Sequence, residues 1–141
     1  MKFLDQKLLH KLKENARIST SELARILDVS RTTVTGRIKK LEDEGVIRGY
    51  TVQYGEKYAS SLLTAHVQIK VTQKLTAQTT LALRQMDQVR SLFAISGDYD
   101  LIAIIEAEST AKLNQVLDRI GDLEGIDRTN SSVILETKFD R

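Results

Sequence analysis

The chain has 141 residues, a formal net charge of +2, and 41% hydrophobic and 28% charged residues, a composition typical of a folded globular protein. It contains no cysteine, which excludes a disulfide framework, a thiolate metal site and a cysteine nucleophile. No signal-peptide core follows Met1 and no apolar run approaches the about 20 residues of a membrane-spanning helix, so the sequence predicts a soluble, cytoplasmic protein without a membrane partner.

Charge is distributed unevenly along the chain. Residues 1–60 carry 12 Lys and Arg against 8 Asp and Glu, whereas residues 61–141 carry 9 against 11. A basic first half followed by a slightly acidic second half indicates nucleic acid as the partner of one end and a different task for the other.

Three helices are predicted in the first half. Residues 3–15 place Leu4, Leu8, Leu9 and Leu12 at helical spacing. Ser19 with Glu22 is a capping-box pair that opens a second helix, whose buried stripe we predict to be Leu23, Ile26 and Leu27. Residues 28–30 break the pattern, and Ser30 is the expected N-cap of a third helix that runs to about Glu44 and ends at Gly45. Two short helices joined by about three residues form a helix-turn-helix.

The third helix has two different faces. Val34, Ile38 and Leu41 recur at core spacing, and between Ser30 and Leu41 there are four cations and no anion. Short hydroxyls allow a close approach to phosphates or bases, and a mid-helix glycine is easier to explain where a groove needs the space. A solvated basic face is the alternative reading of the same pattern. The predicted DNA-binding residues are Ser30, Arg31, Thr32, Thr33, Thr35, Gly36, Arg37, Lys39 and Lys40, with Arg48 in the following extended segment or wing.

The first half resembles the N-terminal region of the Lrp/AsnC family, the feast/famine regulators of bacteria and archaea. The matching residues are Leu4-Asp5, Arg17, Glu22-Leu23-Ala24, Ser30, Val34, Arg37-Ile38, Leu41-Glu42, Gly45-Val46-Ile47 and Gly49-Tyr50. Where relatives often read Asp-Pro-Glu after the wing, this chain reads Gln53-Tyr54-Gly55-Glu56-Lys57 and has no proline. The resemblance therefore does not carry over the geometry of the interdomain hinge.

The second half alternates strands and helices. Ala65, Val67, Ile69 and Val71 alternate with polar residues as in a half-buried strand. Residues 76–87 read as a helix through Leu81, Leu83 and Met86. Strands follow at 89–96 and 101–108, joined by the tight hairpin connection 97–100, and then a helix striped by Leu113, Val116, Leu117 and Ile120. The last strand is predicted from the alternation of Val133, Leu135, Thr137 and Phe139.

The order βαββαβ predicts an α+β fold in which a winged helix-turn-helix domain precedes a ferredoxin-like domain. The expected divisions are residues 1–50 for DNA binding, 51–61 as an extended strand or hinge, and 62–141 for effector binding and oligomerisation. With both helices on one face of the sheet, the other face needs a cover, and a second subunit is the simplest one. Ile69, Ile102, Ile104 and Ile134 are the candidates for that burial.

The segment "GDYD", residues 97–100, has two readings from its residues alone. Its acids can satisfy hydrogen bonds of the turn, or they can bind a small molecule. The second half resembles the regulation-of-amino-acid-metabolism domain of the Lrp/AsnC family, in which this loop lies where dimers meet and helps to bind an effector, usually an amino acid. The resemblance implies a homodimer that often assembles to an octamer, and an effector site at Gly97, Asp98, Tyr99, Asp100, Leu101, Thr129, Asn130 and Ser131.

Other functions are weighed against this regulator. His10 and His66 read as surface or structural histidines, and no nucleophile motif or phosphate-binding glycine loop is present. Two carboxylates in one turn are too few for a dedicated metal cage. We therefore expect no catalytic residues, no metal and no cofactor. The remaining alternatives are an architectural, nucleoid-type DNA-binding protein without effector and a haem-biosynthesis decarboxylase of similar architecture.

Overall fold

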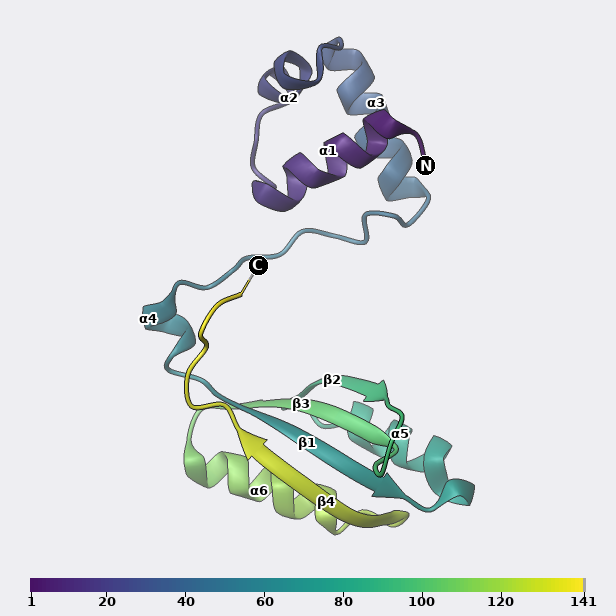
Figure 1. Ribbon diagram of the computed structural model, residues 1–141, viewed down its shortest axis with the longest axis vertical. Helices are drawn as coiled ribbons and strands as arrows, with labels where there is room; N and C mark the ends of the chain where they lie inside the picture. The colour runs from purple at the N-terminus through teal and green to yellow at the C-terminus, as the bar shows by residue number, and fades with distance from the viewer. Residues whose placement is uncertain (141) are drawn as a thin grey trace. The chain divides into compact units, whose positions relative to one another are not determined.

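The computed structural model describes residues 1–140 and divides the chain into two compact units, Met1–Gln53 and the part from Tyr54 onward (Figure 1). No helix among the described residues is long and apolar enough to cross a bilayer. Each unit has a separate hydrophobic core.

The first unit is a bundle of three helices. They are α1 (Phe3–Glu14), α2 (Thr20–Leu27) and α3 (Arg31–Asp43). Both predicted N-caps are confirmed, because the Ser19 hydroxyl accepts a hydrogen bond from the Glu22 amide and the Ser30 hydroxyl accepts one from the Thr33 amide, each at 3.1 Å. Gly45, with φ +71°, lies just beyond α3 in the left-handed conformation expected at a helix end. The buried hydrophobic residues of this unit are Leu8, Leu23, Ala24, Val34 and Leu41, and Asp5 is buried as well.

Two expectations for this unit are corrected. Ile26 is 40% exposed, because Leu23, Ala24 and Leu27 already form the narrow stripe by which the short α2 contacts the core. The segment after Gly45 is irregular and pairs with no strand in the part of the chain that the structure describes. The winged helix-turn-helix therefore has a wing without a β-ladder.

The predicted extended hinge contains a single helical turn, α4 (Glu56–Ala59). The amides of Tyr58 and Ala59 both donate to the Gly55 carbonyl at 3.0 Å, which closes the turn. Glu, Lys and Ala favour helix over extended structure, and this local preference decides the conformation because α4 has no buried residue. The expected extended strand or hinge over 51–61 therefore includes one helical turn at these four residues.

The second unit is a four-stranded antiparallel sheet with two helices on one face (Figure 1). Its strands are β1 (Leu63–Val71), β2 (Val89–Ala94), β3 (Leu101–Ala107) and β4 (Ile126–Val133), in the spatial order β2-β3-β1-β4. The helices are α5 (Thr76–Arg84), preceded by the 3₁₀ turn η1 (Gln73–Leu75), and α6 (Thr110–Gly121). The ferredoxin-like βαββαβ order predicted from the sequence is confirmed.

The core of this unit lies between the sheet and the two helices. Alternate residues of β1 and β3 meet Leu83 of α5 and the stripe Leu113, Val116 and Ile120 of α6. Leu81 was predicted to share this stripe but is 60% exposed. The helix ends at Arg84 and turns Thr79 and Leu83, four residues apart, toward the sheet, which leaves Leu81 on the outer side.

The last strand lies earlier in the chain than predicted. β4 pairs with β1 over Ile126–Val133, while Leu135, which was placed in the strand, is 95% exposed. Almost every side chain of β4 is exposed, so backbone pairing with β1 defines this strand and apolar alternation does not. Thr129, Asn130 and Ser131 consequently lie within the strand and not before it.

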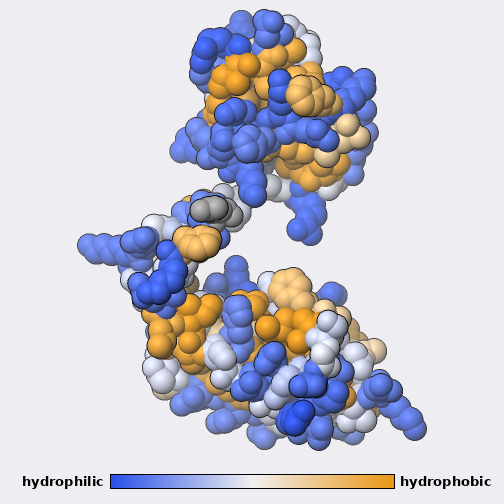
Figure 2. Space-filling model, viewed as in Figure 1, coloured by the Kyte–Doolittle hydropathy of each residue, from blue (hydrophilic) through white to orange (hydrophobic). Residues whose placement is uncertain are grey.

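The sheet face turned away from the helices is partly apolar. Ile102 and Ile104 alternate with the buried residues of β3 and are half-buried, and Phe93 of β2 pairs with Ile102. Figure 2 shows apolar groups gathered over these strands. Ile69 is wrongly predicted to be part of this face, because it is fully buried against the helices. Ile134 follows β4 and is partly exposed.

Gly125 connects α6 to β4 at a position where only glycine fits. Its φ is +93°, and a Cβ atom would lie 2.7 Å from Leu75 Cβ and 2.8 Å from Thr79 Oγ1. We predict that Gly125→Ala lowers the free energy of unfolding by well over about 1 kcal/mol, since strain in the left-handed region and a clash add together. Urea unfolding followed by circular dichroism measures the loss.

Gly97→Ala is the matched control, because Gly97 has φ +112° but open space around the added Cβ. Gly97→Ala is expected to lower the free energy of unfolding by the backbone strain alone, without a clash. Equal losses in the two variants would show that the contact with Leu75 and Thr79 is unimportant.

Candidate nucleic-acid interface and ligand loop

The outer face of α3 is held in place by bonds at the start of the helix. The Ser30 hydroxyl caps the Thr33 amide and also lies 2.8 Å from the Thr33 hydroxyl. Val34 and Leu41 bury the opposite stripe. Thr32, Thr35 and Gly36 are therefore fixed on the exposed side of the helix, where short side chains permit a close approach to another surface.

Each of the four cations of α3 has a partner, but the partners differ. Lys39 contacts Asp43 at 2.9 Å and Lys40 contacts Glu44 at 3.6 Å in exposed pairs one helical turn apart. Such pairs contribute little stability and exchange readily. The hydrogen bond to Asp43 raises the pKa of Lys39. The Arg31 guanidinium donates to the Ser21 hydroxyl at the long distance of 3.5 Å.

Arg37 is less accessible than its predicted role suggests. Its Nη1 lies 3.6 Å from Oδ2 of the buried Asp5, and its side chain is 23% exposed. The structure therefore places Arg37 at the border between the helix core and the outer face, apart from the freely exposed Arg31, Lys39 and Lys40.

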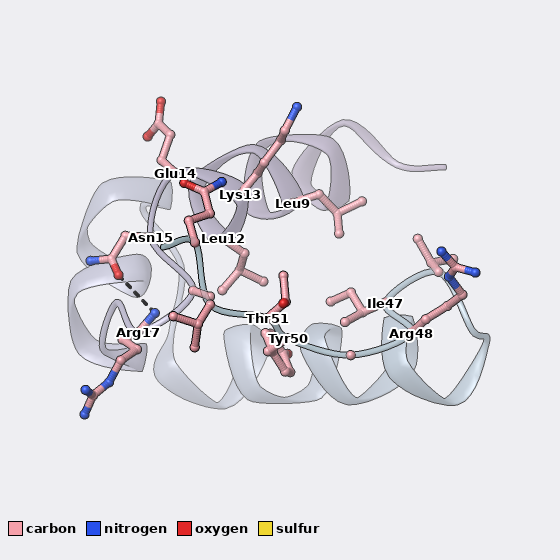
Figure 3. A pocket seen from close by; sticks show the side chains of 15 residues that line it. Leu9, Leu12, Lys13, Glu14, Asn15, Arg17, Ile47, Arg48, Tyr50 and Thr51 are labelled. Carbon is pink, nitrogen blue, oxygen red and sulfur yellow. Dashed lines mark hydrogen bonds between the residues drawn. The ribbon is translucent and has the colours of Figure 1, made fainter. Parts of the chain in front are cut away.

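Arg48 lines a groove between α1 and the segment that follows α3. The groove has a volume of about 890 Å³, and Leu9 and Leu12 point from α1 toward residues 47–51 (Figure 3). The Tyr50 hydroxyl donates to Oε1 of Glu42 at 2.7 Å, which ties this segment to the last turn of α3 and raises the pKa of Tyr50. Glu42, the first acid after the basic face of α3, thus has a hydrogen-bond partner within the first unit.

The loop at residues 97–100 is closed by Asp100 through three separate bonds. The Ile95 amide donates to the Asp100 carbonyl at 3.0 Å, and the Asp100 amide donates to the Ile69 carbonyl at 2.9 Å. Its carboxylate accepts a hydrogen bond from the Val71 amide at 2.9 Å and lies 3.7 Å from Lys70 Nζ. Asp100 is therefore committed to holding the loop against the end of β1.

The three residues before Asp100 remain available to a ligand. Asp98 is exposed, and Gly97 has open space above its Cα atom. Tyr99 is half-buried, with the Arg128 guanidinium 5.2 Å from its ring centroid, within the range of a cation–π contact. The loop thus presents one exposed acid beside an aromatic ring and a cation.

The remaining predicted effector residues are divided by the sheet. Asn130 pairs with Gln68 of β1 and donates to its side-chain oxygen at 3.3 Å. Thr129 and Ser131 pair with Ile69 and Val67, and alternation puts them on the other face. Leu101 is buried in the core, so its side chain is not available to a ligand.

Arg128 and Lys70 are absent from the residues predicted for this loop. Both lie at its side, through the contacts with Tyr99 and Asp100. The misplaced last strand hid Arg128, because the pairing of Lys70 with Arg128 across β1 and β4 is visible only in the correct register. The sequence signal that could have identified this pair was a basic residue, Arg128, on a strand near the aromatic Tyr99.

Comparison with known proteins agrees with both units. A family model described as winged helix-turn-helix DNA-binding matches residues 4–48, and one described as Lrp/AsnC ligand binding domain matches residues 64–141. An HTH-type transcriptional regulator of Pyrococcus furiosus is 35% identical over 133 residues, which cover 94% of this chain and 90% of that protein.

Solved structures share the whole fold. E. coli AsnC is 24% identical with a TM-score of 0.89, and the match covers 100% of this chain and 96% of that one. A transcriptional regulator of Neisseria meningitidis solved in complex with L-Met is also 24% identical with a TM-score of 0.89, over 99% and 93% of the two chains.

The fold, the basic helix and these matches define a transcriptional regulator with a helix-turn-helix DNA-binding domain and a ligand-binding domain. The chain belongs to the Lrp/AsnC family. The architectural protein and the decarboxylase considered from the sequence are not favoured.

Gly36 provides the first test of the outer face of α3. Nothing lies within 4 Å of a Cβ atom added there, so the fold itself gives no reason for a residue that destabilises a helix interior. We predict that Gly36→Ala raises the free energy of unfolding by about 0.5–1 kcal/mol and weakens DNA binding, because the added methyl group occupies the approach surface.

The control is Gly121→Ala, at a second helical glycine with open space, in α6 of the other unit. It is expected to change stability without changing DNA affinity. Denaturant unfolding and fluorescence anisotropy measure the two quantities. Unchanged DNA binding by Gly36→Ala would remove the steric argument for this face.

Proposed function

We propose that this regulator binds specific double-stranded DNA by placing α3 in the major groove, and that a small effector, an amino acid, bound at residues 97–100 modulates its assembly or DNA binding. The observation that carries the first part is the anion-free outer face of α3 between Ser30 and Leu41, combined with a buried stripe that fixes the orientation of the helix. Recognition helices present their first turns to base edges in this way.

The proposed DNA contacts fall into three groups. Thr32 and Thr35 lie with Gly36 on the exposed side of α3. The threonine side chains are short, so they can contact bases or nearby phosphates once the helix is in the groove. Arg31, Lys39, Lys40 and Arg48 supply phosphate contacts, for which the lysines exchange their exposed pairs with Asp43 and Glu44. Ser30 and Thr33 form the helix N-terminus, whose amides and dipole attract a phosphate.

The proposed effector site uses the groups of the loop that are not already committed. Asp98 binds the ligand ammonium, since the Asp100 carboxylate is occupied by Val71 and Lys70. The backbone amides near Gly97 bind the ligand carboxylate, and the Tyr99 ring forms one wall beside Arg128. The L-Met complex of the Neisseria regulator supports an amino acid as the ligand class.

We further propose that the chain is a homodimer that assembles to an octamer. The partly apolar sheet face around Phe93, Ile102 and Ile104 is the proposed contact between subunits. An effector that contacts two dimers at the loop stabilises one association state over another, which links ligand to assembly. In this scheme residues 1–50 bind DNA, 51–61 connect, and 62–141 bind effector and oligomerise, in the cytoplasm and without a cofactor.

DNA contact by the basic face predicts a specific pattern of loss. Arg31→Ala and Lys40→Ala are each expected to weaken operator binding and to lower the slope of log affinity against log salt by about 0.9, the value for one lost phosphate contact. Fluorescence anisotropy on an operator duplex and a scrambled duplex at the same salt concentrations measures both affinity and specificity.

Lys112→Ala is the matched control, because Lys112 forms an equally exposed pair with Glu108 in the sheet unit. It is expected to bind DNA as the unchanged chain does. Loss of assembly by Arg31→Ala or Lys40→Ala in gel filtration would contradict the division of tasks between the units. Equal affinity for the two duplexes would favour an architectural role.

The effector site predicts a different result for each of its two aspartates. In a thermal-shift screen of the twenty amino acids, a ligand at 100 times its Kd stabilises the chain by about 2.7 kcal/mol. Asp98→Asn is expected to abolish this shift while the melting temperature without ligand is unchanged. Asp100→Asn is expected to lower the melting temperature without ligand, because a neutral amide accepts the Val71 hydrogen bond more weakly than the carboxylate and loses the ion pair with Lys70.

Asp118→Asn is the control. It removes one negative charge at an exposed position of α6, outside the loop, and is expected to keep the full ligand-induced shift in melting temperature. A ligand that shifts the Asp98→Asn variant as much as the unchanged chain would locate the effector elsewhere. Gel filtration with and without that ligand then reports whether binding alters assembly.

A further inference from the structure

Asp5 of α1 is an unusual residue in the core of the first unit. It is 6% exposed and is the only buried charged residue in the part of the chain that the structure describes. The hydrophobic core of the same unit is made of aliphatic side chains, chiefly Leu8, Leu23, Val34 and Leu41. A charge in such a place is costly unless it is paired and hydrogen-bonded.

The carboxylate of Asp5 is only half satisfied. Its Oδ2 lies 3.6 Å from Nη1 of Arg37, while its buried Oδ1 has no hydrogen-bond partner among the described residues. An apolar pair of similar volume would stabilise the helix packing at least as well as a buried ion pair with an unsatisfied oxygen. Apart from its favourable place in the first turn of α1, where the helix dipole attracts an acid, Asp5 gives the bundle no stability that an apolar residue would not give.

Arg37 connects this buried acid to the outer face of α3. It follows Gly36 and lies one helical turn from Thr33 and from Lys40, both of which are exposed. Its guanidinium has five N–H donors in a rigid plane, and its side chain is 23% exposed. One edge of the group can thus contact Asp5 while donors on another edge remain accessible from outside.

We propose that Asp5 is a positioning residue for DNA recognition: it holds the Arg37 guanidinium at the flank of α3 so that the outer edge of the group contacts a DNA phosphate. The inference rests on the proposed function, in which α3 binds DNA. A planar guanidinium held on one side by a carboxylate binds a phosphate with less loss of side-chain freedom than a free, mobile arginine does.

This role predicts an effect opposite in sign to simple electrostatics. Removing a negative charge near DNA strengthens binding when the charge acts only through its field. Asp5→Asn is instead expected to weaken operator binding by about three- to tenfold, because the released Arg37 side chain must be immobilised again to reach the phosphate and the contact is largely lost. The sign of the change separates positioning from a field effect.

The experiment measures operator affinity over a range of salt concentrations, on a duplex selected by the unchanged chain from a random-sequence library. The variants are Asp5→Asn, Arg37→Gln and the double variant. Arg37→Gln is expected to lower the salt slope by about 0.9, Asp5→Asn to lower it by a similar amount, and the double variant to bind no more weakly than Arg37→Gln alone.

Two further variants control for charge and folding. Glu14→Gln removes one negative charge from an exposed residue of the same helix and is expected not to weaken binding. Asp5→Glu retains the carboxylate and is expected to restore part of the affinity and salt slope lost in Asp5→Asn. Partial unfolding reduces the fraction able to bind without removing a phosphate contact, so the salt slope distinguishes misfolding from lost positioning.

Each outcome has a distinct meaning. If Arg37→Gln lowers the slope but Asp5→Asn leaves affinity and slope unchanged or increases affinity, Arg37 contacts phosphate without help and the inference is wrong. If Arg37→Gln has no effect while Arg31→Ala and Lys40→Ala weaken binding, Arg37 is structural and the inference also fails, although the proposed function stands. If none of these variants changes DNA affinity, the proposed role of α3 itself is refuted.

Discussion

The first unit depends on a single constraint: one helix of thirteen residues must bury one side in the core and keep the other side free of anions. Val34 and Leu41 meet the first requirement by packing against α1 and α2. The second is met because the acids of α3 occur only at its end, where Asp43 and Glu44 pair with Lys39 and Lys40 and Glu42 bonds to Tyr50. The Ser30 cap fixes where the exposed turn begins.

In the second unit, the sheet order brings residues from separate segments together at one end of β1. β1 lies between β3 and β4, so its last residues contact both the loop that precedes β3 and the first half of β4. The Val71 amide and the Lys70 ammonium contact Asp100, while Lys70 pairs with Arg128, which contacts Tyr99. Three segments far apart in the sequence are thereby brought to one end of the sheet, where the loop is rigid at Asp100 and open at Asp98.

Much of this fold could be predicted from the sequence because local signals agree with the tertiary structure. Caps at Ser19 and Ser30 and the alternation of apolar and polar residues in β1 predicted these elements, although Ile69 was assigned to the wrong face of the sheet. β4 could not be located, since its side chains are polar and mostly exposed and its position depends on backbone pairing with β1. The Arg128–Tyr99 and Asp5–Arg37 contacts were missed because they join residues on separate elements, which no spacing pattern reports.

Residue type alone therefore does not assign function in this protein; the partners of each charge do. Asp98 and Asp100 are two residues apart in one loop, yet one is exposed and the other accepts an amide hydrogen bond from β1. Likewise Arg31 and Arg37 lie on the same helix, but only Arg37 faces a buried carboxylate. A charged group that already contacts another element, such as Asp100 or Arg37, positions its neighbours. A charged group without such a contact is available to a ligand. Since both kinds occur on the same loop and on the same helix, each proposed binding site lies directly beside residues that hold the fold together.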